Sequence, residues 1–305
     1  MTTLIVNQGQ SMVGVFRIEA GLPAINGLLV ATDFSEQATL AVKIAVPLAR
    51  QLGTRLHMLH IVSPLTHAPG GAGITPALRE IDLRSAENRL RRYTARIPEA
   101  RALGPEEIVL CGSVAEAIPA VVESKGIDLV AMGSHGRSGV GRQIFGSHAE
   151  HAVRNLHCPV LIAGPGCSSD FEALHSIVFA TNLSAASSRP ARYAASLAAA
   201  AGATLTLMHV LPYDPQEKAA SREQAKNIAI EQLLLLASGA LSRFEVAFGG
   251  PAEQILQAAD RQEADLIVMG VNEHGGMADH APWATLSEVI RHARCPVLAV
   301  RMQPA

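Results

Sequence analysis

Five of the sixteen residues in the segment 132–147 are glycines, and the segment directly follows a strongly apolar run, IDLVA. Two residues separate Gly133 from Gly136. Nine more precede Gly146 and Ser147, which begin a helical pattern. Glycines let backbone N–H groups turn toward an anion because no Cβ stands in the way, and the N-terminal N–H groups and dipole of a helix favour a phosphate. We therefore predict that this loop binds phosphate groups.

Two side chains of the same loop can strengthen anion binding. The Ser147 hydroxyl can donate a hydrogen bond, and Arg137 can add positive charge. The loop is not a P-loop, because no Gly-Lys-Ser/Thr follows, and it is not a G-x-G-x-x-G motif after a first strand. The alternative interpretation of the segment 132–147 is a tight turn that binds no ligand.

Asp33 is a second candidate for ligand binding, because it ends another apolar run. A carboxylate at the carboxyl end of a parallel strand is a good acceptor for ribose hydroxyls. The alternative is that Asp33 only caps the following helix together with Ser35.

The elements that must position these residues occur twice in the chain. LLVATDFS at 28–35 matches IVFATNLS at 177–184, and DLVAMG at 128–133 matches DLIVMG at 265–270. Each copy alternates short apolar runs with helical patterns, which indicates a doubly wound parallel sheet. In such a sheet ligands bind at the carboxyl ends of the strands, where the strand order reverses. The first-copy strands are expected near 27–32, 55–62, 107–111, 128–133 and 159–163.

The second copy changes the chemistry of the loop. A carboxylate replaces the second glycine, where a phosphate would lie, and an indole replaces the third glycine and would fill the anion site. Two further replacements remove hydrogen-bonding groups. We therefore predict no ATP in the second copy, whose fold remains as a partner for the first. The replacements are Gly136 by Glu273, Gly146 by Trp283, Ser147 by Ala284 and Asp33 by Asn182.

Other polar residues favour a structural interpretation. His60 and His209 occupy equivalent strand positions, where a repeated histidine is more often hydrogen-bonded to the sheet than catalytic. A cluster around Glu273 offers metal-ligand types, but loop residues without fixed spacing are usually polar surface. No nucleophile–base pair or carboxylate dyad is visible. We predict neither a catalytic residue nor a metal ligand.

Composition limits the partners and the location. The 305 residues are 49% hydrophobic, enough for two ordinary cores, and the net charge of −2 argues against nucleic acid. The basic stretch 86–96 is interpreted as a solvated helix face. Four cysteines without a C-x-x-C pair, no signal-peptide pattern and no membrane-spanning run predict a cytoplasmic protein with reduced thiols.

The segment GSHGRSGVGRQIFGS resembles the universal stress protein family, whose nucleotide-binding members carry G-x-x-G-x9-G-Ser/Thr at this place. ATDFS at 31–35, LHIV at 59–62 and HCPVLI at 157–162 resemble its other landmarks. The resemblance covers both copies and implies a tandem universal stress protein. We expect two tandem doubly wound, Rossmann-like α/β domains, each a five-stranded parallel sheet (order 3-2-1-4-5) flanked by helices. The expected boundaries are an N-terminal extension at 1–24, domains at 25–165 and 172–302, and a linker at 166–171.

The resemblance also implies an adenine nucleotide, ATP or else ADP or AMP, with or without Mg²⁺. In that family the aspartate ending the first strand meets the ribose, here Asp33, and the backbone after the second strand frames the adenine, here near Ile61 and Val62. The loop takes the phosphates. The expected cofactor-binding residues are Ala31, Thr32, Asp33, Ile61, Val62, Met132, Gly133, His135, Gly136, Arg137, Gly146, Ser147 and His148.

The favoured function is that of a regulatory stress-response protein, in which the nucleotide in the first copy biases a conformation or a partner surface. One alternative is a slow ATPase or an ATP-using enzyme of the adenine-nucleotide α-hydrolase-like fold. Such enzymes carry a motif like SGGxDS after the first strand. This chain reads ATDFSE at that place, which argues against this alternative. Another is a nucleotide-free dimeric scaffold. In this family the last strands of two domains pair across a pseudo-twofold axis. We therefore expect the two copies to pair within one chain, and we expect two such chains to form a homodimer.

Overall fold

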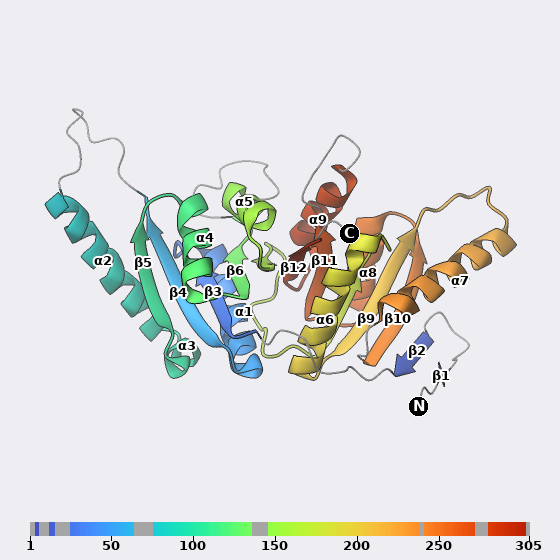
Figure 1. Ribbon diagram of the computed structural model, residues 1–305, viewed down its shortest axis with the longest axis horizontal. Coiled ribbons are helices and arrows are strands. Elements are labelled where there is room, and N and C mark those ends of the chain that lie inside the picture. The colour runs from blue at the N-terminus through green and yellow to red at the C-terminus, as the bar shows by residue number, and fades with distance from the viewer. Residues whose placement is uncertain are drawn as a thin grey trace. The chain divides into compact units, whose positions relative to one another are not determined.

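The computed structural model describes residues 4–5, 12–15, 25–63, 76–135, 146–237, 241–271 and 280–302. The chain divides into two compact units, Ile25–Ala163 and Gly164–Ala305, and the second unit also includes the two N-terminal strands (Figure 1). Within the described ranges, no helix combines the length and the apolar character needed to cross a membrane.

The first unit is one parallel sheet with strand order β5-β4-β3-β6-β7. The order reverses between β3 and β6, so their carboxyl ends form the topological switch point where ligands bind in such sheets. The strands are β3 (Gly27–Ala31), β4 (Arg55–Val62), β5 (Glu106–Cys111), β6 (Leu129–Gly133) and β7 (Val160–Ala163). The helices are α1 (Glu36–Leu52), α2 (Pro76–Ala95), α3 (Pro98–Leu103), α4 (Val114–Lys125) and α5 (Ser147–Asn155).

The second unit repeats this arrangement with the order β10-β9-β8-β11-β12. The predicted α/β fold, with two parallel sheets flanked by helices, is confirmed. The strands are β8 (Ser176–Ala180), β9 (Thr204–Leu211), β10 (Leu241–Phe248), β11 (Leu266–Val271) and β12 (Val297–Arg301). The helices are η1 (Ala185–Ser187), α6 (Ser188–Ala201), α7 (Ala219–Leu236), α8 (Pro251–Arg261) and α9 (His280–His292).

The N-terminal segment contributes two strands that the sequence did not predict. These are β1 (Leu4–Ile5) and β2 (Met12–Val15), which pair antiparallel with each other. β2 also pairs antiparallel with β10, with Val15 opposite Leu241. It thereby covers the edge of the second sheet, which would otherwise offer unpaired backbone groups.

The central strands are buried on both faces, as their continuous apolar sequences predict. Leu28, Leu29 and Val30 of β3 are all 0% exposed, as are Leu129 and Val130 of β6. Consecutive buried residues in a strand require helices on both sides of the sheet. Right-handed crossovers place α1 and α2 on one face of the first sheet and α4 and α5 on the other.

Candidate functional site

The turn after β3 places Asp33 at the carboxyl end of that strand. Phe34 adopts a left-handed conformation with φ of 65°, and its N–H donates to the Thr32 hydroxyl at 3.0 Å. The Asp33 carboxylate accepts the N–H of Ser35 at 3.0 Å, and Ser35 caps α1 by accepting the N–H of Ala38. Both interpretations of Asp33 thus remain compatible with the geometry, because a carboxylate with one such bond has further acceptor sites.

The histidine that the two copies share holds this turn to the neighbouring strand. Nδ1 of His60 lies 2.8 Å from the carbonyl oxygen of Thr32, and Nδ1 of His209 lies 2.7 Å from that of Thr181. The hydrogen-bonded structural role predicted for these histidines is confirmed. The contact joins the ends of β3 and β4, so Thr32 and Asp33 lie beside the last residues of β4.

The start and end of the glycine loop pack closely against the fold. A Cβ at Gly133 would lie 2.7 Å from the carbonyl carbon of Gln37 in α1, and a Cβ at Gly146 would lie 2.5 Å from the oxygen of Ser134. The N–H of Gly146 also donates to that oxygen at 2.8 Å. At both positions the neighbouring backbone lies too close for a side chain, so glycine is required whether or not a ligand is bound.

The N-terminus of α5 is the part of the loop best suited to an anion. Ser35 and Ser113 cap α1 and α4 through their side chains, whereas Gly146 at the start of α5 provides no side-chain hydrogen bond. Ser147 in the first turn is exposed. The first backbone N–H groups of a helix have no intrahelical acceptor, and their dipole favours negative charge. Glu150 in the same turn pairs with Arg154 at 2.9 Å.

Most of the predicted cofactor-binding residues converge on the carboxyl ends of three strands. β3 and β6 are neighbours, so Thr32 and Gly133 follow adjacent strand ends. Nδ1 of His135 lies 3.1 Å from the Ser134 hydroxyl. At these strand ends Thr32 and Met132 are buried, while Ala31, Asp33, Ile61, Val62 and Gly133 are half-buried. Gly136, Arg137 and, in the second copy, Glu273 lie outside the described residues.

Helix α4 packs against α5 close to His148, a contact that the sequence did not predict. His148 at the start of α5 lines a small cavity of about 10 Å³ together with Val114 and Ile118 of α4. The equivalent helix of the second unit contributes Ile255 to a larger cavity. The repeat alignment between 111–118 and 248–255 was the only available signal for this contact.

The second unit has a mostly apolar cavity of about 220 Å³ at the same strand ends. Its lining includes Thr181, Asn182, Gly270 and Met302. The Asn182 side-chain oxygen already accepts the N–H of Ser184 and the hydroxyl of Ser187, at 3.1 and 3.0 Å. A Cβ at Gly270 would lie 2.3 Å from the Met302 Cε, so a flexible side chain stands over this glycine. The cavity is thus built from uncharged residues.

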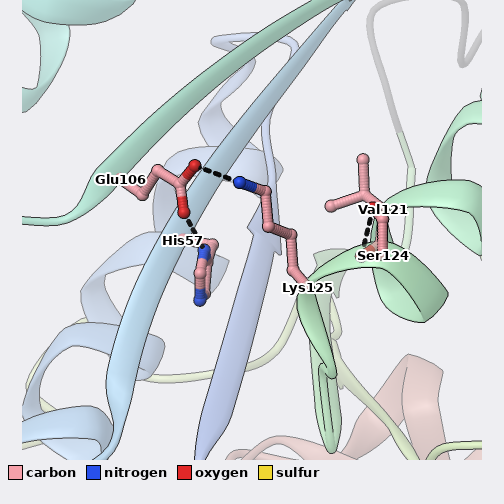
Figure 2. Close-up of polar contacts among 5 residues, drawn as sticks. All are labelled: His57, Glu106, Val121, Ser124 and Lys125. Carbon is pink, nitrogen blue, oxygen red and sulfur yellow. Dashed lines mark hydrogen bonds and ion pairs between the residues drawn. The ribbon is translucent and has the colours of Figure 1, made fainter.

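An ionic cluster lies at the opposite, amino-terminal ends of β4 and β5 (Figure 2). His57 is 3% exposed, and its Nδ1 lies 3.1 Å from Oε2 of Glu106, which also pairs with Lys125 at the end of α4. Burial lowers the pKa of His57, although Glu106 opposes this shift. The hydrogen bond from Lys125 lowers the pKa of Glu106. This cluster is remote from the candidate site along the strands, and we assign it to stability.

The half-buried Cys167 and the buried Cys295 are poor nucleophiles. Burial raises the pKa of Cys167 to about 11 and that of Cys295 to about 12. A thiol must ionise to act as a nucleophile or metal ligand, so neither group is active at neutral pH. Within the described residues, no three His, Cys, Asp or Glu side chains gather as a metal site would require.

Comparison with known proteins gives the same result for both halves of the chain. The model of the universal stress protein family matches residues 26–164 and again residues 174–301. The chain therefore belongs to the universal stress protein family and is of the tandem type.

Full-length relatives support this assignment. The chain is 22% identical to a universal stress protein of Synechocystis sp., over 91% of this chain and 100% of that protein. It is 24% identical to one of Mycolicibacterium smegmatis, over 90% of this chain and 97% of that protein. A universal stress protein structure from Archaeoglobus fulgidus has the same fold, with a TM-score of 0.64 and 23% identity, covering 91% of this chain and 96% of that one.

Proposed function

We propose that this protein is a regulatory, adenine-nucleotide-binding universal stress protein. Its first domain, 25–165, binds ATP, ADP or AMP, and its second domain, 172–302, does not. The observation that carries the proposal is the uncapped start of α5, which follows Gly146 and lies at the switch point of the first sheet. Nucleotide occupancy then biases a conformation or a partner surface of the stress response.

The residues present fit an adenine nucleotide. Asp33 would accept hydrogen bonds from the ribose hydroxyls, and the backbone near Ile61 and Val62 would frame the adenine. Gly133 packs directly against the backbone of Gln37, which places the start of the loop beside the first turn of α1. The phosphates would lie along 132–137 and at Gly146, Ser147 and His148, and an accompanying Mg²⁺ would neutralise part of their charge.

The second domain lacks the groups that this binding needs. Trp283 and Ala284 stand where the first domain has Gly146 and Ser147, and the Trp283 side chain is half-buried in the first turn of α9. The Asn182 amide is neutral and its oxygen is engaged by two donors. A triphosphate would meet an indole there, with neither the serine hydroxyl nor the carboxylate of the first domain.

Two alternatives remain for the activity. A slow ATPase, or an ATP-using enzyme of the α-hydrolase-like fold, would need a base. The described residues offer no metal cluster, and desolvation raises the pKa of both Cys167 and Cys295. A nucleotide-free scaffold agrees with the second domain but gives no function to Asp33 and the exposed Ser147 of the first. We therefore favour binding without rapid turnover.

The proposal extends to assembly and location. Within its own unit β7 pairs with β6, and β12 pairs with β11, so each last strand needs cover on its other edge. We propose that the two domains pair through these strands and that tandem chains form a homodimer, which light scattering after size exclusion would detect as twice the chain mass. The four free cysteines favour a cytoplasmic location.

Thermal unfolding with and without ATP tests the proposal. A ligand at about 100 times its Kd stabilises the folded state by about 2.7 kcal/mol. We expect a higher melting temperature with ATP, and no such rise in the Ser147→Trp variant, which places an indole at the mouth of the site. No shift for the unaltered protein at millimolar ATP favours the scaffold. Phosphate release at several turnovers per minute favours the enzyme.

A further inference from the structure

A second, positively charged cavity lies in the first unit between α2 and the turn after β3. Its volume is about 700 Å³. Phe34 lines it from the turn, and the other lining residues belong to the stretch 85–96. Crossovers place α2 and α1 on one face of the sheet, whereas α4 and α5 lie on the other. None of the described lining residues is among those expected to bind the nucleotide, but the cavity adjoins that site, because its lining residue Tyr93 is hydrogen-bonded to Thr32.

Aromatic rings form the floor of this cavity. The Phe34 ring lies 4.4 Å from the His60 ring and 5.3 Å from the Tyr93 ring, measured between centroids. The Tyr93 hydroxyl donates to the hydroxyl of Thr39 in α1 at 2.9 Å. The Arg89 guanidinium lies 4.2 Å above the Phe34 ring. A cation–π contact of this kind restrains the arginine and leaves its N–H donors directed at solvent or ligand.

Arg89, Arg92 and Arg96 line the cavity together. Spacings of three and four residues place them on one face of the helix, over a rise of about 10 Å. None of the three forms an ion pair with another described residue, and none of the described lining residues is acidic. By contrast, Arg84 of the same helix pairs with Glu80 at 2.6 Å. Positive charge is thus gathered in the cavity without compensation.

The second unit shows that the fold does not require this charge. Its helix α7 joins β9 to β10 just as α2 joins β4 to β5 (Figure 1). Arg222 is the only arginine in α7, and its exposed surface includes Ile228 and Leu235. Leu183 has a φ of 59° at the position of Phe34, so the turn forms equally well without the aromatic ring.

We propose that this arginine cavity binds a small molecule carrying two or more phosphate groups. Arginine suits this role because its planar donor fork matches phosphate oxygens in a bidentate way. The three guanidinium groups lie on long, flexible side chains that can converge on one chain of phosphates, and the volume of the cavity lies in the range of small-molecule sites.

Occupancy of the cavity would be transmitted to Asp33. Phe34 follows Asp33 directly, and its ring packs on His60, which is hydrogen-bonded to the Thr32 carbonyl. A ligand that moved Arg89 off the ring would therefore alter the contacts that hold this turn. Such coupling is reciprocal, so the nucleotide would change the affinity of the arginine cavity by the same factor.

Calorimetric titration of the full-length protein with inorganic tripolyphosphate tests the inference. We expect the Arg92→Ala/Arg96→Ala variant to bind about 30-fold more weakly or worse, because it loses two charge-assisted contacts. The matched control is Arg84→Ala/Arg91→Ala, which removes equal charge from α2 outside the cavity. Its Kd should stay within about threefold of the unaltered protein.

Two outcomes would overturn the inference. One is equal weakening in both double variants, which would reflect general electrostatics. The other is an unaltered protein that shows no binding at millimolar tripolyphosphate. Both variants retain the glycine loop, so tripolyphosphate binding in the Arg92→Ala/Arg96→Ala protein as tight as in the unaltered protein belongs to that loop and also overturns the inference. The ATP titration of the same variants reports on the nucleotide site, which keeps the two proposals separable.

Discussion

Alanine substitution at two equivalent glycines, Gly133 and Gly270, should destabilise the first domain but have little effect on the second. Gly133 is the last residue of β6 and Gly270 the next to last of β11, and neither has a positive φ. The backbone conformation at each position therefore suits alanine. Alanine also lowers the conformational entropy of the unfolded chain, and this effect alone stabilises the folded protein by about 0.4–1 kcal/mol. The difference must come from what the added methyl group meets.

At Gly133 the methyl group would meet rigid backbone. It would lie 2.7 Å from the carbonyl carbon and 2.8 Å from the oxygen of Gln37, and 3.0 Å from the nitrogen of Ala38. Carbon atoms prefer a separation of about 3.5–4.0 Å, so the first turn of α1 must move. Overpacking of this kind destabilises by about 1–3 kcal/mol. When the stabilisation from the restricted unfolded chain is subtracted, we expect Gly133→Ala to lower the free energy of unfolding by about 1–2 kcal/mol.

At Gly270 the methyl group would meet the end of a flexible side chain. Its nearest neighbour is Cε of Met302 at 2.3 Å, and the next are side-chain atoms at 3.1 and 3.2 Å. A methionine can turn away by changing rotamer, and the adjacent cavity of about 220 Å³ offers space. We expect Gly270→Ala to change the free energy of unfolding by less than about 0.5 kcal/mol.

Thermal unfolding of the two variants distinguishes these cases. The single tryptophan of the chain, Trp283, reports on the second domain, while far-UV circular dichroism follows both. Gly133→Ala should lower the melting temperature of the first domain by about 2–4 °C per kcal/mol and leave the Trp283 transition in place. If Gly270→Ala proves as damaging as Gly133→Ala, the reasoning from the flexible neighbour is wrong.

Three further predictions concern binding and pH. Asp33→Asn, the residue of the second copy, should weaken ATP binding about 10–100-fold in calorimetry without lowering stability, because it removes a charged acceptor; unchanged affinity would contradict ribose contact. ATP should leave Trp283 fluorescence unchanged, since the second domain binds none, and saturable quenching would refute this. The pKa of His57 is lowered in the folded state, so the unfolded chain binds a proton that the folded chain does not, and stability falls as the pH drops below about 6.5. His57→Thr should reduce this loss between pH 7.5 and 5.5 in urea unfolding, whereas the exposed-site control His157→Gln should retain it; equal slopes would exclude His57 as the cause.

The parts of the fold that sequence could predict are those with local or repeated signals. Continuous apolar runs identified β3 and β6, and Ser35 was correctly placed as the cap of α1. The matching of 28–35 with 177–184 predicted equivalent turns, and the paired His60 and His209 contacts follow it closely.

The features that sequence missed depend on contacts between distant residues. β2 is four residues long with no clear periodicity, and its partner β10 begins more than 200 positions later. The stretch 86–96 reads as an ordinary solvated helix face. Only the packing of Phe34 beneath Arg89 shows that part of this face lines a cavity. A helical pattern predicts which residues share a face but not what lies opposite.

The number of ATP molecules bound per chain tests whether only the first domain binds nucleotide. Isothermal titration of the full-length Arg92→Ala/Arg96→Ala protein, freed of any co-purified nucleotide, gives the number of ATP sites per chain without a contribution from the arginine cavity. We predict one ATP site per chain. The Ser147→Trp variant of the first domain should lose this site, and the Ala284→Ser variant of the second domain should keep it. Two equivalent sites per chain, or a single site that survives Ser147→Trp, would contradict this prediction.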